Sequence, residues 1–220
     1  MSNLTKTFFK LMQRVIFKEI GTRLRTDILK KLMDPAFSLF EKTASTIPIL
    51  SNIYIGLYND VIKKEIAMAN IKTDDKILVI GCGALPVTPV LITRMTGSYV
   101  TCIDHDRSVI KKASFFIDSM SLNDKIKVEH ADGVGYPIES FNVIVIVYGV
   151  KPSDKILAYV SDQIKNKNTR VILRTTIDNQ GRLPIDIPTS LEIKNTIRLD
   201  SLGAVDSILL QKITKTPNLS

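Results

Sequence analysis

The sequence predicts an α/β fold in which a mostly parallel sheet ends in an antiparallel hairpin and is preceded by a helical N-terminal extension. From residue 76 onward, short apolar runs of strand length alternate with segments of helical length. This alternation is typical of βαβ units with right-handed crossovers. The last two runs are joined only through Asp200-Ser201-Leu202-Gly203. A parallel connection needs about a dozen residues, so these two runs are expected to pair antiparallel.

The first five expected strands are short apolar runs of the kind found in sheets that are buried on both faces, and the last two are longer strand-like runs. The strands are expected at residues 77–80, 99–103, 126–129, 142–147, 170–174, 191–199 and 205–213. The helices between them are expected at residues 87–95, 108–120 and 153–165. One sheet with helices on both sides forms a three-layer sandwich.

Residues 1–70 are expected to form the helical extension, and residues 71–220 the α/β domain. Apolar side chains recur at three- and four-residue steps from Met12 to Leu32, which places them on one face of a helix. The net charge of the chain is +8, and residues 1–31 carry eight basic and two acidic side chains. Because one element holds most of the excess charge, no nucleic-acid partner is expected for the fold as a whole.

The basic N-terminal segment has three candidate partners. Its apolar side, which includes Phe8, Phe9, Met12 and Ile16, can pack on its own α/β domain, on a second subunit of a homodimer, or on an anionic membrane. The sequence favours the first two over peripheral membrane contact. In each case the segment would act as a lid over a substrate site or as an association element.

The cysteine and histidine content limits which cellular compartments, disulfides and metal sites are expected. The two cysteines, Cys82 and Cys102, lack CxxC spacing, and the two histidines have no partner at metal-ligand spacing. We therefore expect no disulfide framework and no metal site, and we expect a reducing, cytoplasmic location. No apolar run in the sequence reaches the roughly 18 residues of a transmembrane helix, so any membrane contact is expected to be peripheral.

Two glycines follow the first expected strand, in the run GCGALP at residues 81–86. At the exit of a first parallel strand, glycines allow a sharp turn and a close approach of the backbone to a ligand. The run follows a strand and precedes a helix, the context in which a GxG motif is informative. A tight turn without a ligand is the alternative. The cofactor-binding residues expected in this loop are Gly81, Cys82, Gly83, Ala84 and Leu85.

Acidic residues follow the second and third expected strands. Asp104 lies about twenty residues beyond the glycines, where a carboxylate accepts protons from both ribose hydroxyls. Capping of the next helix is the alternative for this residue, although Asp106, two positions later, is the more natural cap. His105 is expected to line an adenosine pocket or to be an ordinary loop residue. Asp132 and Gly133 are placed either to contact an adenine amino group or to form a simple turn.

The expected cofactor is S-adenosylmethionine rather than a dinucleotide. Pro86 stands where a third glycine would let a pyrophosphate pass closely, and S-adenosylmethionine has no pyrophosphate. An antiparallel strand inserted beside the fifth strand is also the methyltransferase arrangement. Tyr148 ends the fourth strand at the edge where substrate is expected. It is the candidate catalytic and cofactor-contacting residue, with simple coverage of the sheet edge as the alternative.

From residue 71 to residue 213 the chain resembles the class I S-adenosylmethionine-dependent methyltransferase superfamily, which has a Rossmann-like fold. More narrowly, it is similar to the nicotianamine synthase family and its archaeal relatives, through IGCGALPVT at residues 80–88 and RVILRT at residues 170–175. The resemblance implies that Gly81, Gly83, Leu85 and Asp104 hold the cofactor. Members of the narrower family transfer the aminocarboxypropyl arm of this cofactor and release methylthioadenosine.

Three functions follow from these observations. The first, which is the function expected here, is methyl transfer from S-adenosylmethionine to a small-molecule or lipid-like acceptor, and the other two are alternatives. The second is aminocarboxypropyl transfer of the nicotianamine synthase type, and the third is a non-catalytic module that binds an adenosine ligand. Both transfers are in-line displacements at a carbon beside a sulfonium, so the protein mainly positions the acceptor and excludes water.

Overall fold

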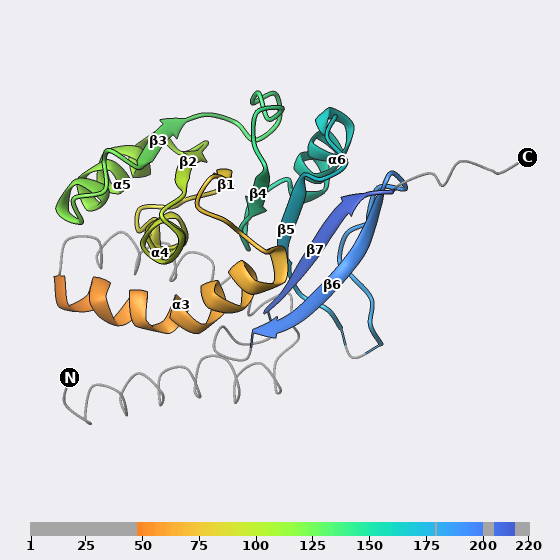
Figure 1. Cartoon of the computed structure of the whole chain (residues 1–220), viewed down its shortest axis with the longest axis horizontal. Helices are drawn as coiled ribbons and strands as arrows, with labels where there is room; N and C mark the ends of the chain where they lie inside the picture. Colours follow the sequence, from red (N-terminus) through yellow and green to blue (C-terminus); the bar gives the residue numbers. More distant parts are fainter. Residues whose placement is uncertain (1–47, 179, 200–204, 214–220) are drawn as a thin grey trace, which may run out of the picture.

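Seven strands form one sheet in the computed structural model, which describes residues 48–178, 180–199 and 205–213 (Figure 1). The strand order is β3-β2-β1-β4-β5-β7-β6. The first five strands pair in parallel, β7 lies antiparallel beside β5, and β6 pairs antiparallel with β7. The structure confirms the predicted parallel sheet with a terminal hairpin, and it places the second hairpin strand inside the sheet.

The observed elements agree with the predicted strands and intervening helices to within two residues at every end. The strands are β1 (Lys76–Ile80), β2 (Tyr99–Asp104), β3 (Ile126–His130), β4 (Val143–Ile146), β5 (Arg170–Thr175), β6 (Leu191–Leu199) and β7 (Val205–Lys212). The helices are α3 (Pro48–Ala69), α4 (Val87–Thr96), α5 (Arg107–Ser119) and α6 (Ser153–Gln163).

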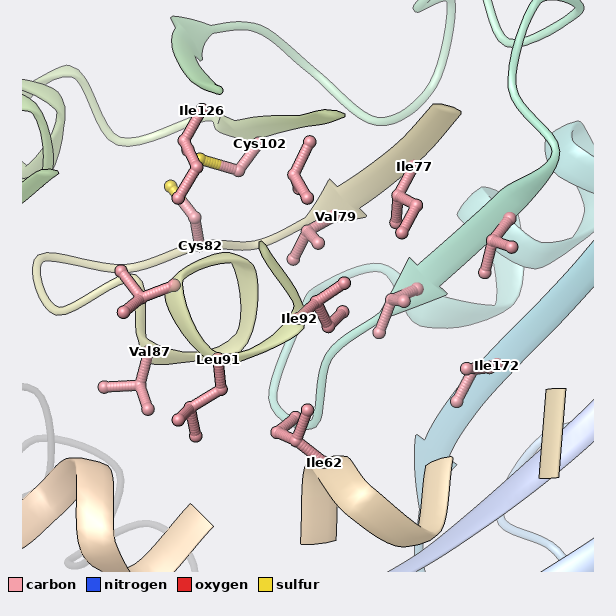
Figure 2. Packing of buried hydrophobic residues seen from close by; sticks show 14 of the residues in the cluster. Ile62, Ile77, Val79, Cys82, Val87, Leu91, Ile92, Cys102, Ile126 and Ile172 are labelled. Carbon is pink, nitrogen blue, oxygen red and sulfur yellow. The ribbon is translucent and has the colours of Figure 1, made fainter. Parts of the chain in front are cut away.

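One face of the sheet is covered by α3, α4 and α5, which share a hydrophobic cluster with β1, β2, β4 and β5. In Figure 1, α3 and α4 lie on the same side of the sheet, and Figure 2 shows Ile92 of α4 between Val79 of β1 and Ile62 of α3. The helix α3 also packs on the C-terminal hairpin through a cluster of Val61 and Val205. This face therefore depends on a helix that precedes the first strand.

The other face is covered by α6 and by two connections without a helix. The segment at residues 131–142 inserts Ile138, which is 2 % exposed, and the segment at residues 176–190 packs Leu183, Ile185 and Ile187 against the same cluster. Apolar side chains from irregular segments thus replace helices on part of this face. The three-layer arrangement confirms the predicted sandwich.

The parallel strands end at a common edge of the sheet. In the register, Ile80 of β1 lies opposite Ile103 of β2 and Ile146 of β4, and Asp104 lies opposite His130 of β3. The loops that follow these strands consequently meet at this carboxyl edge, where open α/β sheets bind ligands. Among the described helices, none is long and apolar enough to cross a membrane.

The predicted domain boundary at residue 70 falls between α3 and β1. Residues 1–47 lie outside the described residues, and with them the basic segment and its proposed partners. The part of the extension that is described, α3, packs directly on the sheet face. Its last turn is also joined to β5, because the Arg170 guanidinium donates to the carbonyl oxygens of Ala69 at 3.0 Å and Asn70 at 2.8 Å.

Candidate functional site at the carboxyl edge

The glycine loop, residues 81–86, turns sharply at the end of β1 and stays hydrogen-bonded to the end of β2. The backbone N–H groups of Gly81 and Cys82 both donate to the carbonyl oxygen of Ile103, at 2.8 and 3.1 Å. Gly81 has a φ of 89°, and a Cβ atom there would lie 2.2 Å from Cγ2 of Val150. A side chain at this position would therefore be strained by the backbone and would collide with the loop after β4.

Asp104 joins the glycine loop to the end of β2. Its Oδ2 accepts the backbone N–H of Gly83 at 2.9 Å, and its Oδ1 accepts that of Asp106 at 3.0 Å. The side chain of Asp104 is 11 % exposed. The capping role belongs instead to Asp106, whose Oδ1 accepts the N–H of Ser108 at the start of α5, at 2.8 Å. Asp104 therefore orders the loop rather than the helix.

The other loop residues point into the core. Ala84 is 1 % exposed, and Cys82 and Leu85 belong to the hydrophobic cluster beneath α4. Figure 2 shows the sulfur atoms of Cys82 and Cys102 turned toward each other. Their hydrogen bond, followed by burial, raises the pKa of the Cys82 thiol above its ordinary value. Cys82 is thus a neutral packing residue, and any contribution of these three residues to a ligand site rests on their backbone.

The loop after β3 lies against the end of β1. Asp132 accepts the backbone N–H of Val134 at 2.9 Å, which closes a small turn. Gly133 is buried, and a Cβ atom there would lie 2.8 Å from Cγ2 of Ile80. The turn that the sequence allowed is present, and glycine suits this position because a larger residue would collide with the side chains of Ile80 and Ile156. Contact of Asp132 with an adenine stays a prediction.

The remaining predicted residues are the most accessible ones at this edge. The side chain of His105 is 74 % exposed, with Nδ1 at 3.6 Å from Oδ1 of Asp104, and its carbonyl oxygen is 3.1 Å from Nε2 of His130. Tyr148 is 41 % exposed and follows β4 directly. Its position at the edge agrees with the prediction, and its roles in catalysis and in cofactor contact stay predictions. Within the described residues, no cluster of possible metal ligands occurs.

A buried polar cluster lies beside this edge on the α3 and α4 face. We call it the Arg174 cluster, and it consists of Glu65 of α3, Thr88 of α4, Arg174 of β5 and Ser207 of β7. The Arg174 guanidinium donates to both Glu65 oxygens, from Nε at 2.8 Å and from Nη2 at 2.7 Å, and from Nη1 to Oγ1 of Thr88 at 2.9 Å. Ser207 donates its hydroxyl to Oε1 of Glu65. The side chains of Arg174 and Glu65 are only 3 % and 1 % exposed.

Sequence analysis did not single out this cluster, although two signals pointed to it. Glu65 lies on the apolar stripe of its helix, three positions after Ile62 and four before Ala69. Arg174 interrupts an otherwise apolar strand after Leu173. Charged residues are almost never fully buried unless they are paired, so each of these charges predicted a partner. The identity of that partner depended on the tertiary structure.

Several solved structures share this fold. MtNAS is a nicotianamine synthase. The crystal structure of a MtNAS mutant in complex with S-adenosylmethionine matches with a TM-score of 0.72 and 16 % identity, covering 84 % of this chain and 76 % of that one. MtNAS in complex with MTA and tNA matches with a TM-score of 0.68 and 17 % identity, over 80 % and 69 % of the two chains. An RNA methyltransferase from Salinibacter ruber in complex with S-adenosyl-L-homocysteine matches with a TM-score of 0.56 and 16 % identity, over 73 % and 95 %.

One curated protein gives a match in sequence. The L-histidine 2-aminobutanoyltransferase of Yersinia pestis is 30 % identical over 74 residues, which cover 34 % of this chain and 28 % of that protein. The match thus spans little more than a quarter of the relative. No family model matches the chain. The comparisons confirm the predicted class I methyltransferase fold and the predicted resemblance to nicotianamine synthase.

Proposed function

We propose that this protein is a transferase that uses S-adenosylmethionine. The observation that carries the proposal is the bond between Asp104 and the glycine loop, in which a carboxylate at the end of β2 accepts the N–H of Gly83 at 2.9 Å. A carboxylate oxygen can accept more than one hydrogen bond, so Asp104 suits the two hydroxyls of a ribose while it holds the loop. The residues present therefore fit an adenosine ligand.

The strand order sets the two sides of this candidate site. Asp132 follows β3, which flanks β2 on the outer side, and Tyr148 follows β4, which lies beyond β1 on the inner side. With Asp104 as the ribose acceptor, Asp132 stands on the adenine side. The start of α4 and Tyr148 stand on the side of the sulfonium and the amino-acid arm. This assignment supports the same cofactor as the resemblance does.

Two observations favour the amino-acid arm as the group transferred. The name of the Yersinia pestis relative describes a 2-aminobutanoyl transfer to L-histidine. MtNAS has been crystallised with S-adenosylmethionine and, separately, with MTA and tNA. We therefore propose a small acceptor that carries an amino group. The amine nitrogen would form a bond to the arm carbon beside the sulfonium as the carbon–sulfur bond breaks, releasing methylthioadenosine and a proton.

Methyl transfer is the second candidate, with a small-molecule or lipid-like acceptor. It is supported by fold neighbours such as the Salinibacter ruber methyltransferase, which was crystallised with S-adenosyl-L-homocysteine. In both reactions the sulfonium supplies the electrophilic carbon and the leaving group. The protein holds the adenosine through Asp104 and the glycine loop, orients the acceptor and excludes water. Tyr148 is the residue proposed to face the acceptor.

Identification of the adenosine by-product distinguishes these reactions. The full chain is incubated with S-adenosylmethionine and either L-histidine or a small-molecule extract of its source cells, and the products are separated by mass spectrometry. Methylthioadenosine above the level formed without enzyme is the expected result. S-adenosylhomocysteine would instead establish methyl transfer. The matched control is Asp104→Ala, which is expected to lose either product.

A binding measurement tests the third candidate, a non-catalytic module that binds an adenosine ligand. Calorimetry on the unmodified protein is expected to show binding of S-adenosylmethionine. Binding without turnover of any acceptor in the extract would support a non-catalytic module. Absence of binding by a folded protein, judged by its circular dichroism and thermal unfolding, would refute the proposed function.

A further inference from the structure

The Arg174 cluster joins two helices of one layer, α3 and α4, to two strands of the sheet, β5 and β7, across long distances in the chain. Glu65 belongs to the helix before the first strand, and its two hydrogen-bonded partners across the sheet are Arg174, 109 positions later, and Ser207, 142 positions later. Such a buried pair contributes little net stability compared with apolar side chains, because both charges lose their hydration. Its presence beside the ligand edge therefore calls for another explanation than stability alone.

The contact with Thr88 points to that explanation. Thr88 is the second residue of α4 and follows the glycine loop within a few positions. The N-cap residue of α4 is Pro86, which makes no side-chain capping bond. A bond from Nη1 of Arg174 to Oγ1 of Thr88, at 2.9 Å, instead ties the first turn of α4 to β5. The loop is thus held on both sides. Asp104 holds it at Gly83, and Arg174 holds the residue that follows it at Thr88.

Charge balance explains why glutamate accompanies the arginine. The first turn of a helix carries a partial positive charge, so a cation placed there is unfavourable by itself. Glu65 neutralises Arg174 through two hydrogen bonds in a planar, two-pronged arrangement. Among the described residues, no buried polar side-chain atom lacks a hydrogen-bond partner. The hydrogen-bonding groups of the cluster are therefore satisfied within the protein, so the cluster can act on a ligand through the position of α4.

We infer that Arg174, Glu65 and Thr88 are positioning residues that fix the first turn of α4 against the amino-acid arm of the bound cofactor. The inference rests on the proposed function, because it takes Asp104 as the ribose acceptor. On that basis the arm lies on the β4 and β5 side of Asp104, where α4 begins. The cluster would set how the arm is oriented without touching it, and adenosine binding would not depend on it.

Two ligands that share the methylthioadenosine part test this inference. S-adenosylmethionine carries the arm and, with it, the sulfonium charge, and methylthioadenosine lacks both. Thr88→Val preserves shape and removes the acceptor of the Arg174 bond, and Thr88→Ser restores a hydroxyl. We expect Thr88→Val to raise the Kd of S-adenosylmethionine about fivefold to tenfold, the size of effect that the net loss of one ordinary hydrogen bond produces. The Kd of methylthioadenosine is expected to stay within about twofold, a limit well below one lost hydrogen bond, and Thr88→Ser to restore the affinity for S-adenosylmethionine.

The matched control is Thr93→Val, at the other end of the same helix. Thr93 is 5 % exposed and Thr88 is 6 % exposed, and the hydroxyl of Thr93 bonds to the carbonyl oxygen of Ser98 at the opposite edge of the sheet. This variant tests the loss of a buried hydroxyl alone, so both affinities should stay unchanged. Thermal unfolding of each variant is measured alongside, so that a general loss of folding is recognised.

Each outcome of this experiment decides the matter. Selective weakening of S-adenosylmethionine in Thr88→Val, with recovery in Thr88→Ser, supports the inference. Equal weakening of both ligands, or no weakening, overturns it and leaves the proposed function intact. If the unmodified protein binds neither ligand, the proposed function itself fails and the inference falls with it.

Discussion

Strand β5 carries an arginine at each end, and the two residues face the same side of the sheet. At the amino end, Nη2 of Arg170 pairs with Oδ1 of Asp75 at 2.5 Å, and the two side chains are 17 % and 9 % exposed. At the carboxyl end, Arg174 pairs with Glu65, and both side chains are almost completely excluded from water. Both arginines bind the C-terminal part of α3 to the sheet, Arg170 through the carbonyl oxygen of Ala69 and Arg174 through Glu65, four residues earlier.

The difference between the two ends shows that arginine has two structural roles on one strand. Arg170 satisfies carbonyl oxygens at the C-terminus of α3, where a cation is favourable. Arg174 lies at the ligand edge, where its pair with Glu65 is fully buried. Burial of the pair has a desolvation cost, and the pair fixes the positions of α3 and α4. The amino edge of the sheet is thus expected to respond to substitution through stability alone, and the carboxyl edge through both stability and ligand binding.

The largest expected effect separates the two arginines. Arg174→Met leaves the Glu65 carboxylate buried without its cation, which is expected to lower the free energy of unfolding by about 3–5 kcal/mol. Arg170→Met removes a less deeply buried pair in which Asp75 still accepts the N–H of Lys72 at 2.7 Å, and it is expected to cost about 1–2 kcal/mol. Chemical denaturation of the two variants measures both values. Equal losses would contradict the distinction between the ends.

The next effect compares glycines at the two edges. Gly81→Ala at the carboxyl edge combines a positive φ with a Cβ contact of 2.2 Å, so we expect a loss of about 2–4 kcal/mol in unfolding free energy. Gly97→Ala at the amino edge also has a positive φ, but its Cβ would lie 3.3 Å from Cγ2 of Thr73. Its expected cost is about 1 kcal/mol. Thermal unfolding of both proteins checks the order.

A third test concerns two neighbouring aspartates. Asp104→Ala is expected to weaken S-adenosylmethionine binding by about 1.5–3 kcal/mol, as for hydrogen bonds to a charged acceptor. Asp106→Ala removes the cap of α5 and is expected to cost about 1 kcal/mol of stability with unchanged affinity. Calorimetry and thermal unfolding of each variant give the two quantities. A loss of affinity confined to Asp106→Ala would place the ligand elsewhere.

The smallest effect uses the exposed ion pair between Lys127 and Glu129. The hydrogen bond from Lys127, followed by that from Tyr136, lowers the pKa of Glu129 below its ordinary value of 4.5. A lowered folded-state pKa adds stability above the unfolded-state pKa, and that stability is lost as the pH falls through the folded-state value. Because solvent screens this pair, Lys127→Gln is expected to cost less than about 1 kcal/mol at pH 7.

The pH series completes this last comparison. Denaturation of Lys127→Gln and the unmodified protein from pH 7 to pH 3 should show a difference that shrinks as Glu129 becomes protonated in both. A difference that grows toward low pH would contradict the assigned direction. A cost as large as that of Arg174→Met would show that burial is not what separates the two ion pairs.

The sequence determined the order of strands and helices because apolar periodicity is a local property of the chain. The run from Ile77 to Ile80 could only be a buried strand, and the short connection after Leu199 allowed only an antiparallel partner. Parallel strands end at one edge, so Gly81 and Asp104 could be placed together before their contact was seen. The role of Asp106 as helix cap was equally local, since a cap bonds to residues two or three positions away.

Only the tertiary structure decided which distant side chains meet. Cys82 and Leu85 were expected at the ligand, but the sharp turn at Gly81 directs their side chains into the core. Glu65 and Arg174 each stood out as a charge in an apolar pattern, yet their sequence separation of 109 positions hid the pairing. Burial of an ion pair depends on how a helix, a strand and a hairpin pack together, and no local pattern contains that information.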